Sequence, residues 1–369
     1  MWVTCAQADF SRGVQLVGRA ISTRTTMPIL GNVLLETQKD GLRLTATDLE
    51  LAVQVDLPAD VQEGGQITLP ARILSEIVGN LPEAMVALKT EKNSTQTEIT
   101  CEASTFEILG LPADDFPSMP DGTLESMGTI NADTARMMIR QTIFAVSTDD
   151  TRPFLTGVYV TMEGSDVRFV ATDAGRLALR KTLLPAPAKQ KVGVIVPAKA
   201  LQELNRALAA VDGDVEIATA GTQLVFAVPG LRLYSRLISG QFPNYQQVIP
   251  QDFKQRVRIS TDRFLRAVRR VSITARDSAN VVRFAAGGKK MTITSNTPEV
   301  GRAREEIDVV AEGETVEVAF NARYLIDCLN NIDAEELSLE LTGPLSPGAI
   351  RPATHTDYVY VLAPVRVYG

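Results

Sequence analysis

Apolar and polar positions alternate in a pattern that recurs three times along the 369-residue chain. The segments 27–55 and 152–181 each contain two alternating runs around a glycine-containing turn and then a third run, and 279–307 is a weaker copy. Alternation with a period of two residues is typical of strands that are buried on one face. Each segment therefore predicts a β-hairpin followed by another strand.

Six further stretches carry apolar residues at intervals of three and four, which predicts amphipathic helices. One precedes and one follows each set of strands, and they cover 9–21, 70–81, 133–146, 197–210, 261–273 and 321–332. Asp9, Asp133 and Thr261 or Asp262 stand where an N-cap residue is expected, while proline or asparagine opens the second helix of each set. The repeating unit is therefore helix, strands, helix, strands.

Two proline-containing segments, 111–120 and 238–250, share a Phe-Pro pair and a final proline, and they mark the ends of the first two units. The sequence therefore predicts three domains, 1–121, 122–251 and 252–369. Many strands with two helices per unit predict an α+β fold, with the helices packed on one face of antiparallel sheets.

The stretch "VATDAGRLAL" at 170–179 has a near copy, "LTATDLELAV", at 44–53. Two interpretations of its Thr-Asp pair are open. Asp48 and Asp173, or the adjacent Asp149 and Asp150, could hold Mg²⁺ in a hydrolase or nuclease. Alternatively, the pair holds a turn through hydrogen bonds from side chain to backbone. Because catalytic sites are seldom duplicated by repetition, the recurrence favours the structural role.

Composition excludes several classes of protein. With 45% hydrophobic and 22% charged residues, the chain is expected to be folded, and without a long apolar run or secretory signal it is expected in the cytoplasm. The cysteines Cys5, Cys101 and Cys328 are expected to be reduced and buried. His355 is the only histidine, and no phosphate-binding loop or zinc motif is present. We therefore expect no enzyme activity, no metal and no cofactor.

Charge is unevenly distributed along the chain. The formal net charge is −7, yet the six predicted helices contain twelve basic and six acidic residues. A basic surface on an acidic protein would attract a phosphate backbone without reading bases. The helical basic residues singled out for this surface are Arg12, Arg72, Arg136, Arg140, Lys199, Arg206 and Arg266. A scaffold that binds peptides but no DNA is the alternative.

The chain resembles the bacterial sliding clamps, the β subunits of DNA polymerase III, over its whole length. The resemblance rests on "MPILGNVLLE", "LTATDLEL", "RPFLTGV", "VATDAGRLA", "FPNYQQVIP" and "YVYVLAPVRV". It implies a head-to-tail homodimer that forms a ring around duplex DNA and slides without sequence specificity. It also implies that Arg24 contacts DNA, and that partners are the polymerase III α subunit, the clamp loader, other polymerases and repair proteins.

The resemblance further implies two protein-binding sites. A pocket between domains 2 and 3 takes short peptides from partners, and its matching positions are Leu155, Thr172, Gly175, Arg176, Leu177, Pro243, Val248, Ser346, Val361, Leu362, Pro364, Val365 and Arg366. The head-to-tail interface would use Phe106 and Ile108 on one side, and Ile273 with an acidic strand containing Glu299 and Glu305 on the other. Ala174, Gly175, Gln247 and the C-terminal tail depart from the family pattern.

Overall fold

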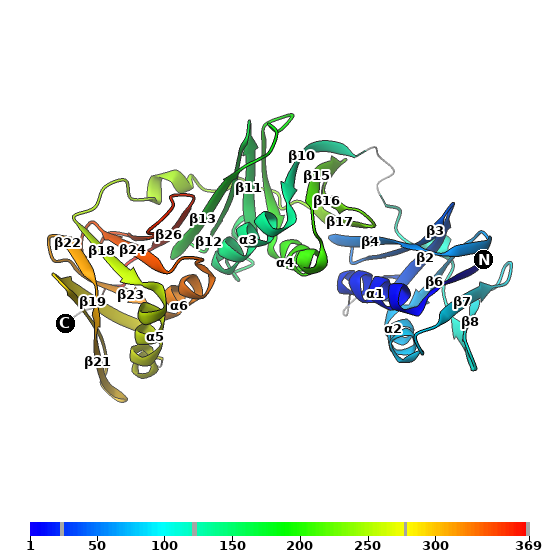
Figure 1. Ribbon diagram of the computed structural model, residues 1–369, viewed down its shortest axis with the longest axis horizontal. Helices are drawn as coiled ribbons and strands as arrows, with labels where there is room; N and C mark the ends of the chain where they lie inside the picture. Colours follow the sequence, from blue (N-terminus) through cyan, green and yellow to red (C-terminus); the bar gives the residue numbers. More distant parts are fainter. Residues whose placement is uncertain (23–25, 120–123, 277–278, 367–369) are drawn as a thin grey trace. The chain divides into compact units, whose positions relative to one another are not determined.

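The computed structural model describes residues 1–22, 26–119, 124–276 and 279–366. It divides into two compact units, whose helices and strands are labelled in Figure 1. Unit 1 consists of Met1–Asp133 with Lys199–Leu237, and unit 2 of Thr134–Ala198 with Ile238–Gly369. The predicted boundary at 121 lies outside the described residues.

All six predicted helices are confirmed. They are α1 (Gln7–Val17), α2 (Ala71–Asn80), α3 (Ala132–Thr142), α4 (Ala198–Ala207), α5 (Thr261–Val271) and α6 (Ala322–Asn331). Short 3-10 turns at 18–20, 143–145, 208–210 and 272–275 continue four of them.

The predicted N-caps of the first helix in each repeat are wrong. Each of these helices follows directly on a strand that the sequence analysis missed, so the last residue of the strand takes the cap position, as Ala6 does before α1. Asp9, Asp133 and Asp262 lie instead in the first turn, where a carboxylate still meets the positive end of the helix dipole. Asn321 does cap α6, since its side chain accepts a hydrogen bond from the Arg323 amide at 2.9 Å.

Unit 1 contains two antiparallel sheets. The five-stranded sheet has the order β5 (Asp60–Glu63), β1 (Trp2–Ala6), β7 (Met85–Thr90), β8 (Gln96–Cys101) and β9 (Ser104–Leu109). The eight-stranded sheet has the order β10 (Glu125–Asn131), β15 (Asp214–Ala220), β16 (Gln223–Val228), β17 (Leu231–Arg236), β4 (Leu51–Pro58), β3 (Gly41–Thr47), β2 (Asn32–Gln38) and β6 (Gln66–Pro70).

Unit 2 also contains two antiparallel sheets. The nine-stranded sheet has the order β14 (Val192–Pro197), β11 (Gly157–Glu163), β12 (Asp166–Thr172), β13 (Arg176–Leu183), β26 (Tyr358–Leu362), β25 (Gly348–Pro352), β24 (Glu336–Leu341), β18 (Gln255–Ser260) and β22 (Val310–Gly313). The four-stranded sheet has the order β21 (Gly301–Asp308), β20 (Lys290–Thr297), β19 (Val281–Gly287) and β23 (Glu317–Asn321).

The largest sheet of each unit crosses a boundary between repeats. In unit 1, β4 of the first repeat pairs with β17 of the second, and in unit 2, β13 of the second repeat pairs with β26 of the third. The second repeat therefore contributes β10 and β15–β17 to one unit and β11–β14 to the other. The predicted hairpins with a third strand are confirmed as β2–β4, β11–β13 and β19–β21.

Helices pack against the sheets through apolar side chains that the period of 3.6 residues places on one face. In α1, Phe10, Val14 and Val17 are buried, and Gly13 lets the helix approach β3 so closely that an added Cβ would lie 2.8 Å from the Leu44 Cδ1 methyl group. Figure 1 shows α1 beside α2 in unit 1. The three cysteines are free and buried, as predicted. No helix among the described residues is long and apolar enough to span a membrane.

Candidate functional site

The turn between β12 and β13 is built by the side chains of Thr172 and Asp173. The Thr172 hydroxyl donates to the Arg176 carbonyl at 2.6 Å, and Asp173 Oδ1 accepts from the amides of Gly175 and Arg176 at 2.9 and 3.0 Å. Ala174 takes a left-handed conformation with φ of 76°. These bonds confirm the predicted role of the Thr-Asp pair in holding a turn.

The first repeat uses the same turn. The Thr47 hydroxyl donates to the Leu51 carbonyl at 3.0 Å, Asp48 Oδ1 accepts from the Leu51 amide at 2.7 Å, and Leu49 has φ of 77°. The second carboxylate oxygen of Asp48 pairs with Lys199, whereas that of Asp173 pairs with Arg176. In both aspartates, one carboxylate oxygen holds the turn and the other pairs with a cation.

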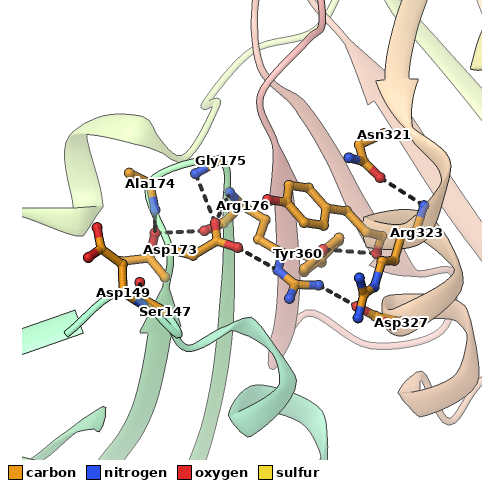
Figure 2. Close-up of polar contacts among 12 residues, drawn as sticks. Ser147, Asp149, Asp173, Ala174, Gly175, Arg176, Asn321, Arg323, Asp327 and Tyr360 are labelled. Carbon is orange, nitrogen blue, oxygen red and sulfur yellow. Dashed lines mark hydrogen bonds and ion pairs between the residues drawn. The ribbon is translucent and has the colours of Figure 1, made fainter. Parts of the chain in front are cut away.

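Arg176 ties this turn to helix α6. Its Nε lies 3.0 Å from Asp173 Oδ2 and its Nη1 lies 2.7 Å from Asp327 Oδ2, as Figure 2 shows. The guanidinium also stacks over the ring of Tyr324, 4.3 Å from its centroid, and the side chain is only 10% exposed. Burial lowers the pKa of Arg176, but Tyr360 and the carboxylates of Asp327 and Asp173 outweigh it, so the pKa is raised overall. The cation is therefore permanently charged and fixed in place.

An apolar cavity of about 280 Å³ opens beside this turn, entirely within unit 2. Most of its lining comes from the turn, from β13 and β26, and from 243–248; the full set is Leu155, Thr172, Ala174, Gly175, Arg176, Leu177, Pro243, Asn244, Tyr245, Val248, Pro347, Val361 and Ala363. Pairing of β13 with β26 sets Leu177 opposite Val361 and so brings the second and third repeats together at the cavity. An apolar cavity with a few polar groups at its rim is the usual form of a peptide-binding site.

The structure brings eight of the thirteen predicted pocket residues to this cavity. Five others do not line it: Ser346, Leu362, Pro364, Val365 and Arg366. Leu362 is fully buried, because neighbouring residues of a strand face opposite sides and its neighbour Val361 faces the cavity. The Val365 amide donates to the Ala319 carbonyl at 2.8 Å, so this part of the tail is held against β23. Sequence reasoning missed five lining residues, of which Asn244 and Tyr245 lie inside the family motif "FPNYQQVIP".

The corresponding place in unit 1 has different side chains. The β4–β17 register pairs Ala52 with Tyr234 at the positions that Leu177 and Val361 occupy in β13–β26. Tyr234 is buried there, and Met119 and Leu124 pack against the same apolar cluster. The two repeat boundaries therefore share the turn but differ in what lies beside it.

The helical basic residues lie on the surface, with one exception. Arg12, Arg72, Arg140, Lys199, Arg206 and Arg266 have exposed side chains, while Arg136 is half-buried and Arg24 lies outside the described residues. Several have acidic partners, such as Asp333 near Arg140 at 3.9 Å and Glu203 near Arg206 at 2.6 Å. Part of the positive charge counted along the helices is therefore neutralised by acids, including Asp48 and Asp333 from outside the helices.

The predicted interface residues lie on two edge strands, a 3-10 turn and the turn before β21. Phe106 on β9 is 38% exposed, but Ile108 is buried, which corrects its assignment to the surface. Ile273 is exposed. Glu305 is on β21 and pairs with Arg270 at 2.9 Å, whereas Glu299 lies in the turn before that strand rather than in it.

Comparison with known proteins gives the same family along the whole chain. Models of the DNA polymerase III beta subunit match 1–120 with its N-terminal domain, 129–244 with its central domain and 246–366 with its C-terminal domain. The beta sliding clamp of Bacillus subtilis is 36% identical over 367 residues, 96% of this chain and 97% of the relative. That of Synechocystis is 35% identical over 391 residues and the whole of both chains.

Solved structures agree. The crystal structure of the DNA polymerase sliding clamp from Bacillus subtilis superimposes with a TM-score of 0.96 and 35% identity over 100% of both chains. The chain therefore belongs to the bacterial sliding clamps, the β subunits of DNA polymerase III, a family of non-catalytic processivity factors for DNA replication.

Proposed function

We propose that two copies of this chain form a head-to-tail ring in the bacterial cytoplasm, which encircles duplex DNA and tethers partner proteins to it. The observation that carries the proposal is the apolar cavity beside Leu177, in a chain of the sliding clamp family. Because the family is non-catalytic, the hydrolase interpretation is set aside. The alternative of a scaffold that does not bind DNA is left to experiment.

The cavity would hold a short apolar segment of a polymerase, clamp loader or repair protein. Its walls come from β13, β26 and 243–248, so one bound side chain would contact both the second and the third repeat. Peptide binding would cost little conformational entropy at the site, since the turn is already fixed by Asp173 and Arg176.

Val248 offers a direct test, because it lines the cavity and is 48% exposed. Val248→Asp should weaken peptide binding at least tenfold, since a charge would be buried against the ligand. Val310→Asp is the matched control, because Val310 is 57% exposed on β22 and does not line the cavity. Equal affinities of the two variants in a fluorescence titration would refute the pocket.

Sliding would rest on the basic helices. Exposed arginines such as Arg12, Arg72 and Arg140 would contact phosphates through long side chains, and their acidic neighbours would keep those contacts weak. Arg12→Glu, Arg72→Glu and Arg140→Glu together should reduce retention on DNA and leave peptide binding unchanged. Reversal of the exposed Lys39 and Lys92 is the control. Equal loss of both activities would show that the arginines are structural.

The head-to-tail contact would join two sheet edges, β9 and β21. β9 is an edge of the five-stranded sheet and carries the exposed Phe106, while β21 is an edge of the four-stranded sheet. Unpaired edges of this kind are suited to pairing with another chain. Glu305 would then lie beside the interface with Arg270, and Ile273 would supply apolar contact.

Two measurements test the ring. Sedimentation at micromolar concentration should give twice the 40.0 kDa of one chain, and a monomer would contradict the dimer. After loading onto a nicked circular plasmid, the protein should stay bound and be released when the circle is cut. Retention that survives linearisation would argue for ordinary DNA binding, and absence of retention for a scaffold.

A further inference from the structure

A second cavity, of about 420 Å³, adjoins the apolar one. The two share Pro243, Asn244 and Tyr245 as a common wall. The rest of the second cavity is formed by residues of β11, β12 and β14 with Lys191, Phe242 and Gln246, and is mostly polar: Tyr159, Thr161, Glu163, Asp166, Arg168, Lys191, Val192, Gly193, Phe242 and Gln246. A segment bound in the first cavity can therefore continue into the second without leaving the protein surface.

Two cations stand directly opposite one another on this face. Arg168 of β12 pairs in register with Lys181 of β13, and both side chains are half-buried. Among the residues that the structure describes, neither Arg168 nor Lys181 has an ion-pair partner. Like charges placed opposite across a sheet destabilise it. The fold therefore sets two positive charges close together, of which Arg168 lines the second cavity and Lys181 lies opposite it on β13.

Two acids, Glu163 and Asp166, also line the second cavity. Glu163 is engaged by Lys191, whose Nζ lies 2.8 Å from Glu163 Oε1. Asp166 is exposed at the start of β12 and pairs in register with Glu163, two positions from Arg168. With a net charge of −7, the whole molecule repels an acidic ligand, so local attraction at Arg168 and Lys181 would be specific to this spot.

The register fixes the distance between the cations and the apolar cavity. Thr172 and Leu177 form a cross-strand pair that lines the cavity, and Arg168 and Lys181 form the pair four positions further along the same face. At about 3.3 Å per residue, the separation is about 13 Å. Between them lie Val170 and Leu179, which pack in the apolar cluster with Phe242 and Tyr245. A peptide anchored at Leu177 would therefore cross the shared wall at 243–245 and reach the cations no fewer than about four residues from its anchor.

We propose that Arg168 and Lys181 bind a carboxylate in the segment that flanks the apolar anchor of a partner peptide. The inference rests on the proposed peptide-binding function and adds a preference to it: partners with Asp or Glu about four residues from the anchor bind more tightly. The site thereby selects among apolar peptides that the first cavity alone would accept equally.

Three labelled twelve-residue peptides test the preference, each with two adjacent leucines as anchor. One carries Asp-Asp four residues after the anchor, one carries Asp-Asp four residues before it, and one carries Ser-Ser in both places. Fluorescence anisotropy should show one acidic peptide binding about threefold to tenfold more tightly than the serine peptide, the gain expected of one or two half-exposed ion pairs. The gain should shrink at 0.5 M salt, an ionic strength at which the screening length is about 4 Å.

Variants separate this site from its surroundings. Arg168→Gln with Lys181→Gln should remove the gain and leave the affinity for the serine peptide unchanged. Lys191→Gln is the matched control, since it removes one positive charge from the same cavity but from a side chain already paired with Glu163. Because it relieves repulsion, Arg168→Gln alone should keep or raise the thermal midpoint, whereas a merely structural arginine would lower it.

The outcomes distinguish the two proposals. If the serine peptide binds and Val248→Asp abolishes that binding, but neither acidic peptide gains, the apolar pocket stands and the inference about Arg168 and Lys181 is wrong. A gain that survives the double variant, or that Lys191→Gln removes equally, also overturns it. If the serine peptide does not bind, or binds regardless of Val248→Asp, the pocket itself is wrong and this inference falls with it.

Discussion

Replacing Arg176 by methionine should loosen helix α6 from the turn at 172–176. Methionine keeps most of the apolar length of the side chain but removes the ion pairs with Asp173 and Asp327 and the stacking on Tyr324. The variant thus isolates the contribution of the charge that joins the second repeat to the third.

The two carboxylates are not equally affected. Asp173 keeps its hydrogen bonds from the Gly175 and residue 176 amides, so little is lost there. Asp327 loses its cationic partner but is 32% exposed and regains water. A charge-assisted hydrogen bond of this kind contributes about 1.5–3 kcal/mol, and a partly exposed cation–π contact about 0.5–1 kcal/mol. We therefore expect the free energy of opening α6 to fall by about 2–4 kcal/mol.

Hydrogen exchange measured by mass spectrometry is the suitable assay, because a chain of several domains does not unfold in one step. Amides of α6 should exchange about 30- to 1000-fold faster, since each 1.4 kcal/mol gives about tenfold. Helix α2 in unit 1 is the internal control and should be unchanged. Asp327→Ala, combined with Arg176→Met in a double-mutant cycle, should show a coupling of about 1–2 kcal/mol.

Exchange of α6 within twofold of wild type in Arg176→Met would refute the reasoning. Water would then replace the ion pairs at no cost. If the same variant lost peptide binding without faster exchange, Arg176 would act by touching the peptide and not by fixing the turn.

Three further predictions concern packing, backbone conformation and titration. Gly13→Ala should destabilise unit 1 by about 1–3 kcal/mol, because its Cβ would lie 2.8 Å from a leucine methyl group. Gly79→Ala in α2, where the added Cβ meets nothing within 4 Å, should instead stabilise unit 1 by about 0.5–1 kcal/mol. Denaturant unfolding of the two variants measures both changes. Ala174→Gly should raise the thermal midpoint slightly, since φ of 76° strains alanine, and an unchanged or lower midpoint would contradict this. Burial raises the pKa of the Cys5 and Cys328 thiols from 9.0 to about 12. Between about pH 9 and pH 12 these thiols ionise only in the unfolded state, so the folded state loses stability as the pH rises through this range. Cys5→Ala with Cys328→Ala should lose less stability than wild type between pH 8 and pH 11.

The helices and most strands could be predicted because a period of two or 3.6 residues depends only on near neighbours. The strands β1, β10 and β18 were missed because each runs into a helix with no turn residues between them, as Ala6 to Gln7 shows. The division of the second repeat between two units could not be predicted, since it follows from pairing of β4 with β17 and of β13 with β26 across long separations.

In the candidate site, too, local contacts could be predicted from the sequence and contacts between distant residues could not. Thr172 and Asp173 act within four residues of the chain, so their bonds could be inferred from sequence. The partner of Arg176 on α6, Asp327, lies 151 residues away and carries no local signal. Ile108 and Leu362 are buried, although the sequence analysis places them at binding surfaces. Which face of a sheet a residue points to depends on the register of its strand, and the sequence alone does not give that register.

The first two repeats are connected in two different places. One is the polypeptide segment between them, and the other is the pairing of β4 with β17. The peptide connection runs through 111–124, yet the first repeat is held to the second by a ladder of backbone hydrogen bonds elsewhere in the eight-stranded sheet. A protease cut in that connection would divide the polypeptide without dividing the sheet. Two separately expressed pieces should therefore reassemble through this ladder.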